Sequence, residues 1–388
     1  MKFSQIFPLL LAASSAFSYV DTSERLDTLE KEMKEISAVN PQDTLGAGFT
    51  ASRPNTVGNH WFITFDLLYW HPKLGGTEYA ISTNPDLYIT PGGNQRFLLL
   101  QHEGAIKEND FSWDFGLKAG IGYKTPYDSW DVYARYTWFD SNSSSSCYKL
   151  PPATIFTLRS VEGTAAKWAK SHVDISYDTI ELQLARSYFL SSRLSVRPHL
   201  ALKTAWISLA QNITYNRSDL PRVRPELVDL DRKIKDSSKM RGYGPQAGVD
   251  GNLYIGNGFS LIGELSGSIL YSYFRVRHKE THPLIIEGDF VQGGTLFNIK
   301  EKQHRFIPYV QMLMGLTWST YLNNDKQHLS LKGGYEVQYF WRVNQMMKTE
   351  SRIAFPFSED QRALRHYFDT ITEDLMFYGI TGEVRLDF

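Results

Sequence analysis

The end of the chain alternates between apolar and polar residues, and this period constrains the fold more than any other feature. Successive side chains of a strand point to opposite faces, so one face can meet lipid while the other meets water. Glu383 and Arg385 lie on one face of this segment. The other face carries the residues that we expect to form a membrane-insertion signal: Tyr378, Ile380, Val384, Leu386 and Phe388. A strand that ends on phenylalanine in this way is typical of the closing strand of a bacterial outer-membrane barrel.

The first residues have the features of a secretory signal. Met1 and Lys2 precede an apolar run over residues 6–13, and Ala16 and Ser18 precede a suitable cleavage point. We therefore expect residues 1–18 to be a signal peptide. The apolar run is shorter than the roughly 20 residues that a membrane-spanning helix needs, and no later segment has such a run. A helical membrane protein is excluded.

Residues 19–38 have a helical period. Leu26, Leu29, Met33 and Ile36 recur at spacings of three and four. Isolated helices of this length are marginally stable, so a partner is needed, either other copies in a homotrimer or the membrane surface. We expect a short periplasmic helix here, then a linker over residues 39–59, and a barrel over residues 60–388.

Ten segments from Trp61 onward, including the last one, alternate in this manner. Short turns and long links alternate strictly between them, and Asn257-Gly258 is a strong hairpin signal. Outer-membrane barrels have tight periplasmic turns and long external loops. The sequence therefore predicts an all-β fold, a transmembrane antiparallel up-and-down barrel of ten strands. Its segments are 61–70, 111–123, 130–139, 173–189, 193–208, 242–256, 259–274, 304–319, 327–343 and 375–388.

Short segments within the long links leave a barrel of twelve or more strands as an alternative. Most of them are too short to cross a membrane, so we expect loops that fold above or into the lumen. The candidate segments are 79–82 with 97–101, 154–160, and 284–290 with 295–299.

The outward aromatic residues are sorted by depth. Trp61 and Phe259 lie at periplasmic strand ends, and Trp138 and Tyr271 lie at external ends, with mostly aliphatic residues between the two levels. Aromatic rings favour the headgroup level on both sides of a membrane. A soluble β-sandwich would also alternate, but it would not sort its aromatic residues in this way.

The opposite faces of these strands are polar and form the predicted lumen. One interpretation is a pore whose charges set ion preference. The alternative is a plugged barrel whose charges neutralise one another, because eight to ten strands enclose little more than side chains. The predicted pore-lining residues are Asp114, Lys118, Asp131, Arg135, Glu181, Arg197, His199, Lys203, Asp250, Glu264, Lys332, Glu336, Arg342, Glu383 and Arg385.

Other classes of function have little support in the sequence. With a formal net charge of -1, the chain has no basic surplus to suggest nucleic acid. It has no Gly-rich phosphate loop, zinc cluster or nucleophile elbow, so we expect no cofactor, metal or catalytic residue. An outer-membrane hydrolase is one alternative, with His172 and Asp174, or Asp110 and Asp114, at the external rim.

Three polar features fall in the long links. His278 and His282 have a helical ligand spacing, but we expect solvated loop histidines. The charged stretch over residues 217–241 is interpreted as a hydrated loop, with contacts to lipopolysaccharide or to a host as an alternative. Cys147, the single cysteine, is expected to be a free thiol rather than an intermolecular link.

Several strand segments carry a resemblance to a known family. They are 62–70, 120–123, 130–133, 136–139, 194–198, 205–206 and 242–245. These segments resemble the pore-forming major outer membrane proteins of Legionella and of the environmental chlamydiae, from about residue 60 to the end and also over the helix before it. The resemblance implies an abundant surface porin that is sometimes also an adhesin. A cysteine-linked envelope, as in the pathogenic chlamydial major protein, does not fit a chain with only Cys147.

We therefore expect an outer-membrane porin for passive diffusion of small hydrophilic solutes, which is also a major surface protein and not an enzyme. The alternatives are a non-conducting barrel that acts as an adhesin or envelope scaffold, and a barrel hydrolase. The expected partners are outer-membrane lipid and lipopolysaccharide, the barrel-assembly machinery, a homotrimer and a host surface.

Overall fold

The computed structural model describes most of the chain after residue 60. The described residues are 50–51, 60–83, 104–125, 130–149, 154–160, 165–191, 193–217, 231–286, 289–323, 326–354 and 363–388. The expected signal peptide, the helix over residues 19–38 and most of the linker over residues 39–59 lie outside them. Within the described ranges the elements are strands, and no helix there is long and apolar enough to cross a membrane.

Ten strands form a closed ring, as the sequence predicts. Each pairs antiparallel with its two neighbours, β8 pairs with β10, and β17 pairs with β2 to close the ring. In ring order the strands are β2 (Trp61–Leu74), β5 (Asp114–Lys124), β6 (Trp130–Tyr148), β8 (Ala165–Arg186), β10 (Leu194–Arg217), β11 (Asp231–Gly256), β12 (Phe259–Ile286), β13 (Asp289–Leu322), β14 (Gln327–Asn344) and β17 (Glu373–Asp387).

The remaining strands do not join this ring, so the alternative of twelve or more wall strands is wrong for the described residues. They are β1 (Thr50–Ala51), β3 (Ala80–Thr83), β4 (Gly104–Lys107), β7 (Thr154–Thr157), β9 (Tyr188–Ser191), β15 (Met347–Ala354) and β16 (Ala363–Thr370). β7 pairs with β8 through Ile155 and Ala166, while β15 and β16 form a separate hairpin. The expected segment 97–101 lies outside the described residues.

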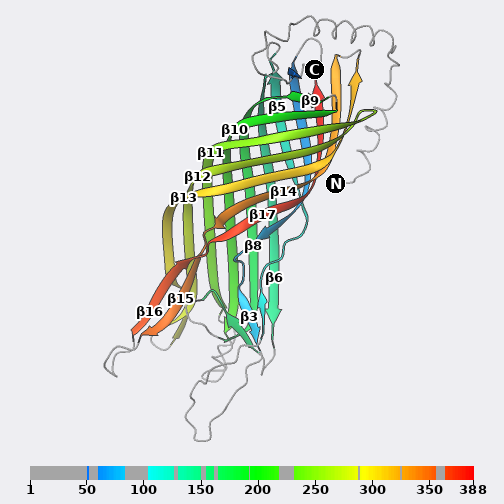
Figure 1. Cartoon of the computed structure of the whole chain (residues 1–388). Helices are drawn as coiled ribbons and strands as arrows, with labels where there is room; N and C mark the ends of the chain where they lie inside the picture. The colour runs from blue at the N-terminus through cyan, green and yellow to red at the C-terminus, as the bar shows by residue number, and fades with distance from the viewer. Residues whose placement is uncertain are drawn as a thin grey trace, which may run out of the picture.

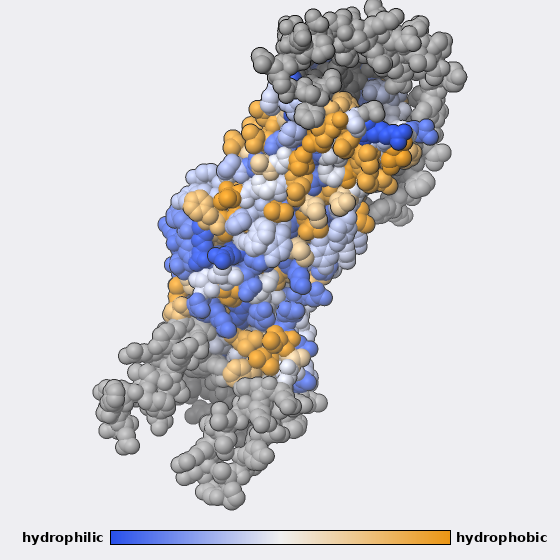
Figure 2. Space-filling view, in the orientation of Figure 1, coloured by the Kyte–Doolittle hydropathy of each residue, from blue (hydrophilic) through white to orange (hydrophobic). Residues whose placement is uncertain are grey.

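The wall strands keep the two-residue period over most of their described length. On β2, for example, Ile63 and Leu67 are exposed on the outer face, whereas Phe62 and Leu68 are buried inside the ring. The terminal strand behaves in the same way, with Ile380 and Val384 exposed. The outer surface is therefore apolar around the wall, and Figure 2 shows apolar surface near the end of the molecule where β17 ends.

The hairpin between β11 and β12 has the geometry that its sequence predicts. Asn257 and Gly258 have φ angles of 52° and 82°. Positive φ at both central residues is the signature of the two-residue turn that suits the twist of paired strands. The tight turns of the barrel lie at this end, which we identify as the periplasmic end.

Several strands extend far past the thickness of a membrane. β11, β12 and β13 have 26, 28 and 34 residues, whereas about 9–11 residues cross a bilayer. The excess lies at the end opposite the C-terminus, where Figure 1 also shows β3, β15 and β16. This end is the external one, so the barrel continues above the membrane as a tall collar.

The lumen as the candidate functional site

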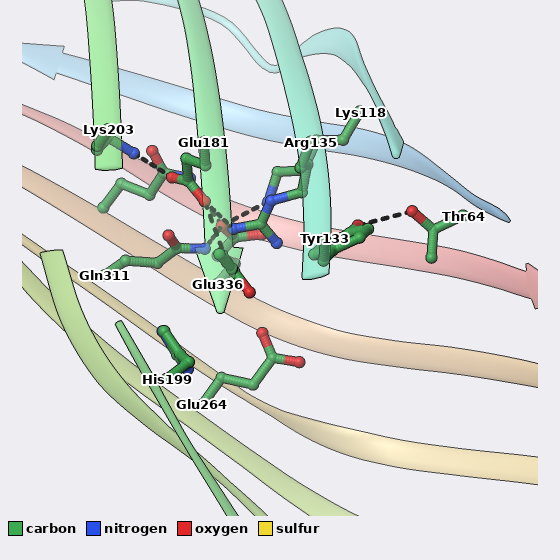
Figure 3. A network of polar contacts seen from close by, with 12 residues as sticks. Thr64, Lys118, Tyr133, Arg135, Glu181, His199, Lys203, Glu264, Gln311 and Glu336 are labelled. Atoms are coloured by element: carbon green, nitrogen blue, oxygen red, sulfur yellow. Dashed lines mark hydrogen bonds and ion pairs between the residues drawn. The ribbon is translucent and has the colours of Figure 1, made fainter. Parts of the chain in front are cut away.

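The centre of the lumen holds a network of buried, paired charges. Lys118 Nζ on β5 lies 2.7 Å from Glu336 Oε1 on β14, and both side chains are almost fully buried. Arg135 Nη2 on β6 lies 2.6 Å from Glu181 Oε2 on β8, and Lys203 on β10 also pairs with Glu181. Figure 3 shows Glu181 between these two cations. The charges that could have lined an open pore instead neutralise one another.

Neutral side chains satisfy the rest of this network. The carboxylate of Glu336 accepts hydrogen bonds from Gln311 Nε2 and Gln338 Nε2, each at 2.7 Å, and from Thr381 Oγ1 at 2.6 Å. A buried charge is stable only when its partners and its remaining hydrogen bonds are all in place. The network is therefore a fixed part of the wall rather than a loose lining.

A cavity lies on the periplasmic side of this network. Its volume is about 430 Å³, and its lining is mainly polar. Arg197 reaches across part of it, with Nε 2.9 Å from Asp131 Oδ2 and Nη1 2.6 Å from Asp250 Oδ2. Lys332 pairs with Glu264 at 2.7 Å and with Glu383 at 2.5 Å. This half of the lumen has room for water between its ion pairs.

An aromatic layer lies on the external side of the network, and it was not predicted from the sequence. Trp70, Phe139, Tyr177, Phe340 and Phe377 are all 0–1% exposed, although they belong to five different wall strands. Their ring centroids are 4.9 Å apart for Tyr177 and Phe377, and 5.3 Å apart for Phe139 and Phe377. We call these five side chains the aromatic layer.

The aromatic layer crosses the full width of the ring. β8 and β14 are diametrically opposite in the ring order, and their residues Tyr177 and Phe340 have ring centroids 5.6 Å apart. Tyr177 also donates a hydrogen bond from its hydroxyl to Gln338 Oε1 at 2.7 Å. One tyrosine therefore joins the aromatic layer to the charged network below it.

The external mouth is filled by the short strands. Tyr79, next to β3, and Ile155 on β7 are fully buried against inward residues of β10, including Ile213 and Tyr215. Tyr215 donates a hydrogen bond to the carbonyl of Tyr79, and Gln211 Nε2 donates one to the carbonyl of Thr77 at 2.9 Å. The loops fold into the lumen, as the sequence predicts.

The predicted pore residues occupy three positions. Lys118, Glu181, Lys203 and Glu336 form the charged network together with Arg135, which also borders the cavity. Two fall outside the central lumen: Asp114 is partly buried and accepts a hydrogen bond from Ser141 at 2.6 Å, and Arg342 is exposed. Arg342 has a φ of 57°, at the point where the pairing of β14 with β17 shifts register. The residues that line the cavity are Asp131, Arg135, Arg197, His199, Asp250, Glu264, Lys332, Glu383 and Arg385.

The expectation of solvated loop histidines is wrong for His278. Its side chain is fully buried inside the collar on β12, with Nδ1 2.5 Å from Asp236 Oδ1 on β11. The predicted strand stopped at residue 274, at the expected membrane surface, whereas β12 continues to residue 286. The side chain of His282 lies outside the described part of the structure.

The hydrolase candidates do not converge on one site. Ser143 donates a hydrogen bond to the backbone carbonyl of Asp110, whereas Ser141 donates one to the carboxylate of Asp114. On the outer face, His172 Nε2 lies 3.0 Å from Asp174 Oδ1, and His172 Nδ1 lies 2.7 Å from Ser144 Oγ. This row of side chains lies on the outside of the collar, away from the lumen.

Comparisons with known proteins agree with this architecture. The family described as Legionella pneumophila major outer membrane protein precursor matches residues 53–388. No curated protein matches the chain.

Two solved structures are similar to this chain. The outer membrane protease OmpT from Escherichia coli is 10% identical, with a TM-score of 0.40, over 89% of this chain and 99% of that chain. A deltaS2S3 mutant of TodX, a monoaromatic hydrocarbon channel, is 12% identical, with a TM-score of 0.26, over 87% of this chain and 92% of that chain. Likenesses this distant carry no argument about activity. The family match covers every strand of the ring, and the chain therefore belongs to the Legionella pneumophila major outer membrane protein family and is a protein of the outer membrane.

Proposed function

We propose that this protein is a closed-lumen surface barrel, which acts as a scaffold of the outer membrane and presents its collar to the outside. One observation carries the proposal: side chains from diametrically opposite strands meet across the lumen. The ring centroids of Tyr177 and Phe340 are 5.6 Å apart, so no water-filled path remains between them.

The apolar character of the aromatic layer also supports a barrier to ions. Trp70, Phe139 and Phe377 close the section beside that pair, and all are buried. A hydrophobic constriction blocks ions even where a narrow gap remains, because water is unstable there. The aromatic layer belongs to the wall strands themselves, so movement of the loops in the mouth would not open it.

The collar supports the surface role. β11 and β12 extend well beyond the membrane span, and β12 pairs with β13 out to Ile286 and Asp289. A structure of this height is unnecessary for diffusion through the membrane, but it holds a rigid surface above the lipid.

A porin is the second candidate, and the cavity favours it. The cavity of about 430 Å³ is lined by charged side chains, as a path for small hydrophilic solutes would be. A porin of this kind would conduct only after side chains of the aromatic layer move apart. The diffusion function expected from the sequence stays a prediction.

We also propose that the protein is not an enzyme. Ser144 and His172 sit opposite each other in a continuous antiparallel ladder of β6 and β8. Acyl transfer needs free N–H donors aimed at the developing oxyanion, whereas β8 at His172 is paired with β6 on one edge and with β10 on the other, so its N–H groups are used within the sheet. The flat outer face at His172 therefore lacks the oxyanion-binding donors that a hydrolase site needs.

Solute flux separates the two candidates. Purified full-length protein in liposomes should produce no osmotic swelling in arabinose or glycine, as for protein-free vesicles. Tyr133→Ala, which enlarges the cavity without touching the aromatic layer, should also produce none. If liposomes with the wild-type protein swell, and liposomes with Tyr133→Ala swell faster, the closed barrel is contradicted and the porin is supported.

A further inference from the structure

The outer face of the collar is strongly basic on one side. The outward residues of β11, β12 and β13 form rows across these three strands. The row nearest the membrane is Arg241, Tyr273 and His304. The next two rows are Lys239, Arg275 and Lys302, and then Ser237, Arg277 and Lys300. Lys235 and Lys279 pair in the next row, and Lys233 follows on β11. These side chains are exposed or partly exposed. We call the basic face the set Lys233, Lys235, Lys239, Arg241, Arg275, Arg277, Lys279, Lys300 and Lys302.

Within the described ranges, the structure gives this face no carboxylate partner. Asp236 and Glu280 lie on the same strands, but their side chains are buried inside the collar. Glu301 alternates with Lys300 and Lys302 and so faces the other way. The contacts made by the basic face are to neutral groups, such as Arg277 Nε to Asn298 Oδ1 at 3.2 Å and Arg275 over the ring of Tyr273.

Like charges stand directly opposite each other across the strands. Lys239 pairs with Arg275, which pairs in turn with Lys302, and Arg277 pairs with Lys300. Cross-strand partners have Cβ atoms about 5 Å apart, and like charges at this distance are destabilising. An arrangement that costs stability on its own is expected where an anion neutralises it.

The basic face begins at the level where a membrane ends. The row below it is aromatic: the rings of Tyr243 and Tyr271 are 5.8 Å apart, and those of Tyr271 and Phe306 are 5.4 Å apart. Below this row the outward residues are apolar, down to Leu253 and Leu261 at the periplasmic end. Aromatic rings mark the headgroup level, so the cations lie among and just above the headgroups of the outer leaflet.

The side of the collar formed by β6 and β8 has a different charge. On β6 and β8 the outward residues include Asp178 in the row of Trp138, Asp140 and Asp174 above it, and Lys170 further from the membrane. The outward residues of β10 between the two sides, such as Ser208 and Asn212, are neutral. The cations are therefore a feature of one face and not a general property of the surface. Figure 2 shows hydrophilic surface beyond the apolar part of the wall.

We infer that the basic face binds the phosphate groups of a phosphorylated glycolipid in the outer leaflet. Lysine and arginine are the side chains that bind phosphate, arginine in a bidentate manner. Basic side chains next to a membrane contribute roughly 1 kcal/mol each to the binding of anionic headgroups. The face lies parallel to the barrel axis above the aromatic row, so a lipid anchored beside the wall presents its phosphates to it. A soluble anion would gain nothing from this placement.

Binding of lipid A, a bisphosphorylated glycolipid, to the full-length protein in neutral detergent micelles tests the inference. Wild-type protein should bind lipid A more tightly than its monophosphorylated form, and should not bind a phosphocholine lipid. The double variant Lys239→Ser with Lys302→Ser should bind lipid A roughly 30-fold more weakly, because it loses the contributions of two lysines. The matched control is Lys167→Ser with Lys170→Ser, which removes two exposed lysines from the collar on β8. It should bind as the wild type does.

A second readout separates ligand binding from folding. Lipid A should raise the unfolding temperature of the wild-type protein and of the control but not of the double variant. Without lipid A the double variant should be at least as stable as the wild type, because it loses like-charge repulsion. Equal losses in both variants would overturn the inference, since the effect would then be one of total charge. Binding of heparin with no preference for lipid A would also overturn it, in favour of a soluble polyanion.

Discussion

The two halves of the lumen are lined by the same strands but are filled in different ways. In the periplasmic half, Arg197 and Lys332 reach carboxylates around a cavity of about 430 Å³. At the aromatic layer, Tyr177 and Phe340 meet in the middle and leave no such space. The ring of ten strands therefore permits an internal space, and the size of the side chains at one level decides whether this space becomes a channel.

The largest loss of stability is expected from the charged network between the two halves. Glu336→Ala leaves Lys118 buried without its carboxylate, whose oxygen lies 2.7 Å away. An uncompensated buried charge costs several kcal/mol, so we expect about 4 kcal/mol of lost unfolding free energy. Urea unfolding in detergent micelles, followed by tryptophan fluorescence, measures it.

The matching double variant tests whether pairing is the cause. Lys118→Met together with Glu336→Met removes both charges and should recover most of the loss. If the double variant is as unstable as Glu336→Ala alone, the carboxylate matters for its other hydrogen bonds rather than for Lys118.

The aromatic layer should also be important for stability, because its residues are packed on all sides. Phe377→Ala should cost about 3 kcal/mol, since it leaves a cavity among aromatic rings. The neighbouring Tyr378 lies on the outer face, partly exposed, and Tyr378→Ala should cost less than about 1 kcal/mol. Equal costs for the two, in the same urea experiment, would show that the layer is not tightly packed.

A smaller effect is expected where the two halves are joined. Tyr177→Phe keeps the ring in the layer but removes the hydrogen bond to Gln338, which is 2.7 Å long. The loss should be about 1 kcal/mol. A change too small to detect in urea unfolding would mean that the layer and the network are energetically independent.

The smallest effect concerns reactivity rather than stability. Cys147 packs inside the collar against Tyr79 and its neighbours, and burial raises the pKa of its thiol. The thiolate is the reactive form, so maleimide labelling of the folded protein at pH 8 should be slower than that of free cysteine. The rate should keep rising above the pH at which free cysteine levels off. Labelling as fast as free cysteine would place the thiol outside the packed collar.

Local patterns predicted the wall of the barrel well. The two-residue period and the turn at Asn257 and Gly258 depend on neighbours in sequence, so the ten strands and the closing strand could be recognised. The apolar outer face around Ile380 follows from the same period.

The aromatic layer was missed for a physical reason, although a signal existed. Trp70 and Phe340 stand at inward positions within stretches that are apolar on both faces, 67–70 and 339–341. Apolar residues on both faces indicate a strand that is buried on both sides. That Tyr177 meets Phe340 rather than another residue depends on the ring size and the stagger of the strands, which no local pattern contains.

The collar was underestimated because a membrane sets only a minimum length for a strand. His278 and residues 231–241 were interpreted as loops, yet they lie on β12 and β11 above the membrane. Their alternation of buried and exposed residues is as regular as in the wall. A search for alternation beyond the span expected for a bilayer would have found them.

Planar-bilayer conductance tests most directly whether the aromatic layer is what closes the lumen. The wild-type protein should insert and stay electrically silent, while Trp70→Ala with Phe377→Ala should open steps of ion current. The control Tyr69→Ala with Tyr378→Ala, on the outer face of the same two strands, should stay silent. Steady open-channel current through the folded wild-type protein would contradict the account, and so would silence of the variant that lacks both inward rings.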